Sequence, residues 1–281
     1  MQNLPNNRIK RALVLSGGAA RGAFQVGVLR CLEQLGWRWD LVCGSSIGAI
    51  HAVALGVGHG SAHLERLWRT ALPKRLETFQ AAKLLRRFFS SADPFSISDA
   101  GSVRRILEQE IDFHLLCKAE TSVCIAAVDL MTSKTVYFTN REITVDHVMA
   151  SAAAPVFYPW RMAGGRPYFD GGLMANTPIL PALQSGAAQI VVVLLSPVTA
   201  VDQNPPRSLR KTVETAFELM LAGPFQAALD GYRAAGGTVP EIRLIAPRRM
   251  LGFRSLADYS RRQVDRLMAE GDDATRQVMG D

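Results

Sequence analysis

This sequence lacks long apolar runs, histidines after residue 147 and cysteines at paired spacing. No stretch reaches about 18 consecutive apolar residues, so we expect no transmembrane helix. The apolar stretch near the start is too short for a signal peptide, so we expect a cytosolic protein. The cysteines have no C-x-x-C spacing, which favours reduced core thiols over disulfides or metal ligands. The four cysteines are Cys31, Cys43, Cys117 and Cys124.

Strong charge, internal repeats and low-complexity tracts are also missing. The net charge of +7 over 281 residues is modest, and it favours anionic surfaces such as phospholipid headgroups. Nucleic acid would need a concentrated basic stripe, so we expect no nucleic-acid partner. No linker divides the chain, and we predict a single domain over residues 1–281.

Strand and helix patterns alternate along most of the chain. Residues 11–16 and 189–195 are short apolar runs typical of buried parallel strands, and residues 23–35 carry one apolar helical face that Gly36 ends. This alternation predicts an α/β fold: a three-layer α/β/α sandwich with a mostly parallel central sheet. Further strands are predicted at 40–43, 122–128, 135–139, 167–169 and 241–245, and further helices at 44–58, 61–105, 145–153, 209–235 and 257–279.

A G-x-S-x-G motif stands between a predicted strand and a predicted helix. It runs Gly44-Ser45-Ser46-Ile47-Gly48. A serine on such a tight turn is pushed out of the sheet edge, and the glycines permit the cramped backbone. The helix that follows directs its N-terminal dipole at an oxyanion formed there. The motif predicts Ser46 as a nucleophile, and the alternative is a plain Ser/Gly turn capping a helix.

A glycine-rich loop, residues 16–22, also lies between a strand and a helix. Backbone N–H groups in such loops converge on an anion. Ala23 and Phe24 stand where a P-loop requires Lys and Ser/Thr, and Ala19 replaces the second glycine of the dinucleotide fingerprint. An oxyanion hole remains, with Arg21 adding positive charge or bracing the loop. Its predicted residues are Gly17, Gly18, Ala19, Arg21 and Gly22. The alternative is a glycine turn for close helix packing.

The third motif, Asp170-Gly171-Gly172, ends a short predicted strand and means little by itself, because Asp-Gly is a common turn. It becomes informative only together with the other two motifs. In this order the three resemble the patatin-like phospholipases, with a G-G-G-x-R-G-type loop, a G-x-S-x-G and a later Asp-Gly-Gly/Ala. The similarity extends to residues 150–159 and 169–179 and is strongest over 11–200. The departure is Ala19, where many members have a third glycine.

The resemblance implies a patatin-like fold and a Ser–Asp dyad, which maps onto Ser46 and Asp170. It implies a lipid acyl hydrolase that forms an acyl-enzyme at Ser46, with Asp170 as general base and with no metal or organic cofactor. A carboxylate can serve as base if partial burial raises its proton affinity. A Ser–acid–His triad requires a histidine after the acid, and the last histidine is His147.

Rival functions stay open at this point. An acyltransferase or thioesterase would use the same acyl-serine, and a regulatory or binding protein would keep the fold without turnover. A nucleotide-binding α/β protein is disfavoured by the missing fingerprints.

A basic amphipathic stretch suggests contact with lipid. Ala81, Leu84, Leu85 and Phe88 fall at helical spacing opposite Lys83, Arg86 and Arg87. Such a helix is typical of a lid or of a peripheral membrane contact, although a packed surface helix has the same pattern. Residues 248–254, with three arginines around Leu251 and Phe253, form a weaker second candidate.

Overall fold

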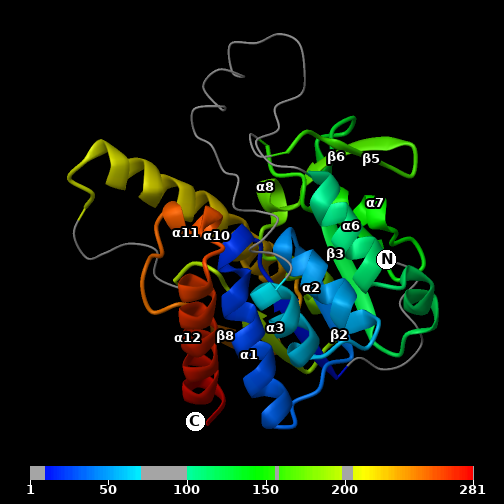
Figure 1. Ribbon diagram of the computed structural model, residues 1–281, viewed down its shortest axis with the longest axis horizontal. Coiled ribbons are helices and arrows are strands. Elements are labelled where there is room, and N and C mark those ends of the chain that lie inside the picture. The colour runs from blue at the N-terminus through cyan, green and yellow to red at the C-terminus, as the bar shows by residue number, and fades with distance from the viewer. Residues whose placement is uncertain (1–9, 71–99, 156–157, 198–204, 281) are drawn as a thin grey trace.

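A computed structural model describes residues 10–70, 100–155, 158–197 and 205–280 (Figure 1). The amphipathic stretch 81–88 lies outside the described residues, so its predicted role stays a prediction. In the part of the chain that the structure describes, no helix has the length and apolarity needed to cross a membrane.

The centre of the molecule is a mixed sheet of eight strands. Its parallel part consists of neighbouring strands in the order β3, β2, β1, β7, β8. These strands are β1 (Arg11–Leu15), β2 (Leu41–Ser45), β3 (Ser122–Asp129), β7 (Gln189–Val193) and β8 (Glu241–Ile245). Three antiparallel strands complete the sheet: β4 (Lys134–Thr139) and β6 (Arg166–Asp170) pair with β3, and β5 (Arg161–Ala163) pairs with β6.

Helices cover both faces of the sheet, which confirms the predicted three layers (Figure 1). Because successive side chains of a strand point to opposite faces, Leu13 and Leu15 of β1 enter one core and Ala12 and Val14 enter the other. The first core lies under α1 (Ala23–Gln34), α2 (Ile47–Gly56) and α12 (Arg261–Gly280). The second lies under α9 (Leu180–Gln184) and α10 (Leu209–Ala234). Helices α1 and α12 lie side by side.

Shorter elements surround these layers. They are η1 (Ala19–Gly22), α3 (Ser61–Thr70), α6 (Ala100–Glu110), η2 (Phe113–Lys118), α7 (Val145–Ser151), α8 (Gly172–Ala175) and α11 (Arg254–Ala257). The predicted helix 257–279 starts later, because Ser260 caps α12 by accepting the N–H of Gln263 at 3.3 Å. Strand β5 was not predicted, since three residues are too few to show an alternating pattern.

The cysteines are all free thiols, but the expectation that all four lie in the core is wrong for one. Cys31, Cys43 and Cys124 are buried, whereas Cys117 is exposed. Cys117 lies in η2, where only Leu116 is buried. An apolar neighbourhood in the sequence therefore did not place Cys117 inside, because the short 3-10 helix turns most of its side chains to solvent.

Candidate active site

Ser46 and Asp170 meet because two strands share one edge of β3. Ala126 of β3 pairs with Ser45 of β2 and with Tyr137 of β4, and Ala127 pairs with Asp170 of β6 and with Val136 of β4. Since β4 occupies one edge of β3, β2 and β6 must both lie on the other edge. Parallel β2 ends at Ser45, and antiparallel β6 ends at Asp170, one position further along. The carboxyl ends of the two strands therefore converge there.

The backbone at Ser46 has the geometry of a nucleophile elbow. Ser46 has φ 55° and ψ −123°, a region that side-chain-bearing residues seldom occupy and that is common at functional sites. Its N–H donates to the carbonyl of Ser151 at 3.1 Å and to the Ser151 hydroxyl at 3.3 Å. That hydroxyl in turn donates to the carbonyl of Ala126 at 2.6 Å. Ser151 thus fastens the elbow to β3.

The two elbow glycines permit close approach of backbones. A side chain at Gly44 would lie 2.2 Å from the carbonyl oxygen of Gly48, and one at Gly48 would lie 2.2 Å from that of Leu15. Only glycine at both positions lets the start of α2 rest against β2 and β1. The strand–turn–helix geometry predicted for this motif is therefore present, and its dependence on glycine is steric.

Asp170 is buried, with 3% of its surface exposed, and it lines the same cavity as Ser46. One carboxylate oxygen accepts the N–H of Gly172 at 2.6 Å. Desolvation raises the pKa of Asp170 from 3.8 to about 7, although the Ser46 side chain and the N–H of Gly172 act in the opposite direction. Gly171 follows directly and lies against the Ala126 carbonyl. The carboxylate is therefore a far stronger proton acceptor than an exposed aspartate.

The glycine loop lies against Ser46, but its residues differ in whether their backbone N–H groups are available as donors. A side chain at Gly17 would lie 3.0 Å from Cβ of Ser46, and the N–H of Gly17 already donates to the carbonyl of Asn176 at 3.0 Å. Gly17 is thus a spacer and not an available donor. Gly18 and Ala19 line the same cavity as Ser46, and within the described residues no hydrogen-bond acceptor receives their N–H groups. These two amides are therefore free to donate to a group bound in the cavity.

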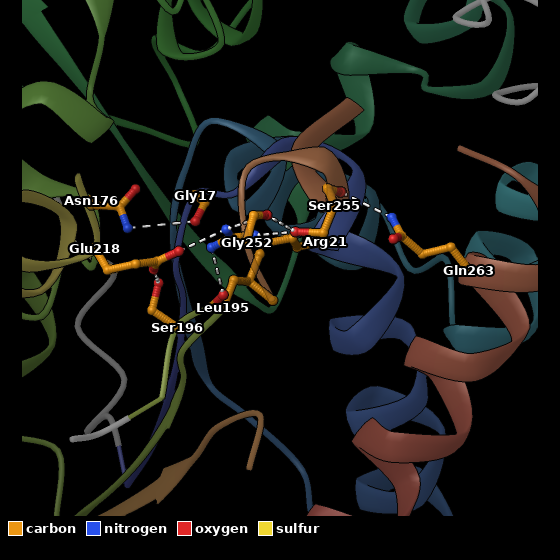
Figure 2. A network of polar contacts seen from close by, with 9 residues as sticks. All are labelled: Gly17, Arg21, Asn176, Leu195, Ser196, Glu218, Gly252, Ser255 and Gln263. Atoms are coloured by element: carbon orange, nitrogen blue, oxygen red, sulfur yellow. Dashed lines mark hydrogen bonds and ion pairs between the residues drawn. The ribbon is translucent and has the colours of Figure 1, made fainter. Parts of the chain in front are cut away.

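Arg21 does not point at the site, which corrects its prediction as part of an oxyanion hole. Its side chain is fully buried and forms a 2.7 Å ion pair with Glu218 of α10 (Figure 2). It also donates to the carbonyl oxygens of Leu195 and Gly252 and to the hydroxyl of Ser255. The hydroxyl of Ser196 donates to the same glutamate. Of the two roles considered for Arg21, bracing the loop is the one its contacts fit.

Gly22, the last residue of η1, also has a packing role. A side chain there would lie 2.5 Å from Ile47 and 2.9 Å from Trp68. Gly22 is not among the residues that line the cavity at Ser46, whereas Gly18 and Ala19 are.

A cavity of about 280 Å³ opens over Ser46 and Asp170. Its wall is almost entirely apolar, and the elements that supply it are far apart in sequence. The apolar wall includes Ile47, Ile50, Val103, Met149, Ala152, Ala154, Pro155, Tyr158, Leu173, Phe217, Leu221, Leu256, Ala257 and Tyr259. Such a wall suits a hydrocarbon chain and keeps water from the carboxylate.

All five histidines lie within the described residues, and none of them lines this cavity. His51 is buried in the core, where its Nε2 accepts the indole N–H of Trp68 and its Nδ1–H donates to Gln25. Burial lowers the pKa of His51 to about 3, so it is neutral. His147 belongs to the capping box that starts α7. Neither ring is placed to take a proton from Ser46.

Two residues of the site were missed by sequence reasoning, Ser151 and Asn176. Both fall inside segments that resemble the family, 150–159 and 169–179, so their position was noticed but their role was not. Asn176 is 6% exposed and holds Gly17 through its backbone carbonyl, and Ser151 holds the elbow. The roles of Ser151 and Asn176 depend on their hydrogen-bond partners, which the sequence does not reveal.

The chain is similar to known proteins both in sequence and in fold. A cGAMP-activated phospholipase of Escherichia coli (strain TW11681) is 30% identical, with 60% of this chain and 53% of the relative covered. VipD of Legionella pneumophila has a TM-score of 0.53 at 17% identity, covering 98% of this chain and 67% of that one. Human GIVD cytosolic phospholipase A2 has a TM-score of 0.50 at 13% identity, covering 97% and 57%. Because the sequence identity is so low, these two structural similarities support the fold alone.

The chain spans about half the length of the curated relatives that it matches. The model of the patatin-like phospholipase family matches residues 13–183. This range contains all three motifs and therefore both Ser46 and Asp170. This chain belongs to the patatin-like phospholipase family.

Proposed function

We propose that the protein hydrolyses carboxylic esters of lipids through an acyl-enzyme at Ser46, with Asp170 as general base. The observation that carries the proposal is that these two side chains line one mostly apolar cavity, where the Ser46 side chain acts on the Asp170 carboxylate. A nucleophile, a base of raised proton affinity and room for a hydrocarbon chain are the parts that lipid acyl transfer to serine requires. Membership of a phospholipase family supports the same substrate class.

The proposed reaction follows from this geometry. Asp170 accepts the hydroxyl proton as Ser46 Oγ attacks the ester carbonyl carbon, and the carbonyl oxygen becomes an oxyanion. The N–H groups of Gly18 and Ala19 stabilise that oxyanion, each donor contributing about 3 to 4 kcal/mol. The leaving alcohol takes the proton from Asp170 as the C–O bond breaks. Water then repeats the sequence on the acyl-serine, releasing the fatty acid and restoring the hydroxyl of Ser46.

The direct test maps the nucleophile and the product together. The purified protein is treated with an alkyl fluorophosphonate, and the modified peptide is identified by mass spectrometry. Fatty acid release from a phospholipid is measured with and without the probe. We expect modification at Ser46 and parallel loss of hydrolysis. Modification at another residue, with hydrolysis unaffected, would reject the assignment.

The raised pKa of Asp170 predicts the pH dependence of turnover. The base must be deprotonated, so kcat/KM should rise with pH and level off above an apparent pKa of about 7. An unperturbed aspartate would give full activity from pH 5 upward. The profile is measured with a short soluble ester so that no interface contributes. An activity already constant between pH 5 and 8 would contradict a buried aspartate base.

The glycine loop should matter to turnover more than to binding. In Gly18→Val the new side chain would lie within 3 Å of Leu195, so the backbone must shift and carry its N–H out of line. Donors aimed at the oxyanion act in the transition state, so we expect kcat to fall about 100- to 1,000-fold with little change in KM. Gly231→Ala is the control, because Gly231 is an exposed glycine of α10 with open space around it. A higher KM at unchanged kcat would exclude this role.

A further inference from the structure

We propose that Arg161 is an anion-binding residue of the active-site cavity and that it recognises the phosphate of a phospholipid substrate. This inference rests on the proposed function and deepens it, because it names the feature that distinguishes phospholipids from neutral esters. No motif of the sequence singled Arg161 out.

The position of Arg161 places its side chain beside the site. Arg161 is the first residue of β5 and pairs with Tyr168 of β6, two residues before Asp170. It lines the cavity that holds Ser46 and Asp170, and among the described residues of the wall it is the one with a cationic side chain. A single guanidinium in a mostly apolar wall needs an explanation, since an aliphatic side chain would suit such a wall better.

The side chain of Arg161 has no partner within the described chain. Its Nε is buried and makes no hydrogen bond, and no carboxylate forms an ion pair with it. By contrast, Arg166 on the neighbouring strand pairs with Asp129 at 2.8 Å, and buried Arg21 pairs with Glu218. A buried donor without an acceptor destabilises the folded protein, because its hydrogen bond to water is lost and not replaced. An acceptor that arrives with the substrate would offset that destabilisation on binding.

The chemistry of the acceptor follows from the guanidinium. Its planar fork of N–H donors matches the oxygens of a phosphate, and such charge-assisted pairs are stronger than neutral hydrogen bonds. Arg161 lies on β5, whereas Asp170 ends the neighbouring strand β6, so the two side chains enter the same cavity from different strands. A glycerophospholipid likewise carries its phosphate and its ester carbonyl at separate positions of one molecule. The acyl chain would occupy the apolar wall.

The test uses two substrates that differ only in the phosphate: a monoacylglycerol phosphate and the monoacylglycerol with the same chain. Both are assayed below their micelle concentrations with the full-length protein and with Arg161→Gln. We expect kcat/KM for the phosphate-bearing substrate to fall about 10- to 100-fold, the range for a hydrogen bond to a charged group, and kcat/KM for the neutral one to stay within about twofold. Arg161→Lys should lie between, because it keeps the charge but not the fork.

Arg166→Gln is the matched control, since Arg166 lies on the adjacent strand with its charge already paired. It should leave the preference between the two substrates unchanged. Equal losses on both substrates in Arg161→Gln would show a role in folding, and unchanged rates on both would show a solvated surface arginine. Either outcome overturns the proposal.

Binding is measured separately in a Ser46→Ala background, by calorimetry with the monoacylglycerol phosphate. This arm reports on Arg161 even if the protein hydrolyses neither substrate, in which case the proposed function fails on its own. We expect Arg161→Gln to weaken binding about 10-fold or more. Inorganic phosphate should bind far more weakly than the lipid. If inorganic phosphate bound as tightly as the lipid, and if this binding depended on Arg161, the site would be one for free phosphate and not for a lipid headgroup.

Discussion

Replacing Ser46 by alanine should lower kcat/KM for ester hydrolysis at least about 1,000-fold, the scale seen when a serine nucleophile is removed. The hydroxyl lies on the elbow between β2 and α2 and lines the same cavity as Asp170, so alanine removes the nucleophile from the position that the base serves. Fluorophosphonate labelling should disappear in the same variant. Activity is measured on a soluble ester, and folding is checked by circular dichroism.

Ser45→Ala is the matched control, because the motif contains two adjacent serines. Ser45 is fully buried, and its hydroxyl has no hydrogen-bond partner among the described residues. Removing an unsatisfied buried hydroxyl should leave kcat/KM unchanged and leave stability equal or slightly higher. A folded Ser46→Ala protein that still hydrolyses esters at the parent rate would exclude the acyl-serine mechanism. If activity were lost in Ser45→Ala and kept in Ser46→Ala, Ser45 would be assigned as the nucleophile.

Asp170→Asn should have two large effects of opposite sign. It removes the general base, so turnover should fall about 100- to 10,000-fold. It also removes a carboxylate whose ionisation in the folded protein is opposed by burial. The amide keeps an oxygen to accept the N–H of Gly172 and carries no charge to desolvate. The variant should therefore be nearly inactive and yet more stable than the parent above neutral pH.

The direction of the stability effect follows from linkage. The pKa of Asp170 is raised from 3.8 in the unfolded chain to about 7 in the folded protein. Between these values the unfolded state has released the proton and the folded state has kept it, so the stability present below pH 4 is lost as pH rises to 7. Over pH 5 to 8 this one group should remove about 3 kcal/mol from the free energy of unfolding.

Urea unfolding of the parent and of Asp170→Asn at pH 5 and pH 8 isolates this contribution, because all other groups are shared. The gap between the two proteins should widen by about 3 kcal/mol at the higher pH. Asp129→Asn serves as comparison: Asp129 is equally buried but is paired with Arg166, so its loss should destabilise the protein at both pH values. An Asp170→Asn protein that is less stable than the parent at pH 8 would contradict the burial argument.

Local patterns were enough to identify the main elements and the three motifs. Apolar runs such as 189–195 identify buried strands because a buried parallel strand has no polar face. The elbow was recognisable because close backbone approach requires glycine at positions 44 and 48, and this requirement is visible as letters in the sequence. By itself, then, the sequence determined the layers of the fold, the chemical types present and their order along the chain.

Tertiary structure alone decided which of these groups work together. Arg21 belongs to a loop that reads as an anion site, but Glu218, nearly 200 positions later, draws its charge away from the cavity. The N–H of Gly17 is taken by Asn176, which leaves Gly18 and Ala19 as the proposed donors. Arg161 becomes notable only because no described residue pairs with it. Hydrogen bonds and ion pairs depend on atoms within about 3 Å, and the distance between residues along the chain carries no information about such contacts.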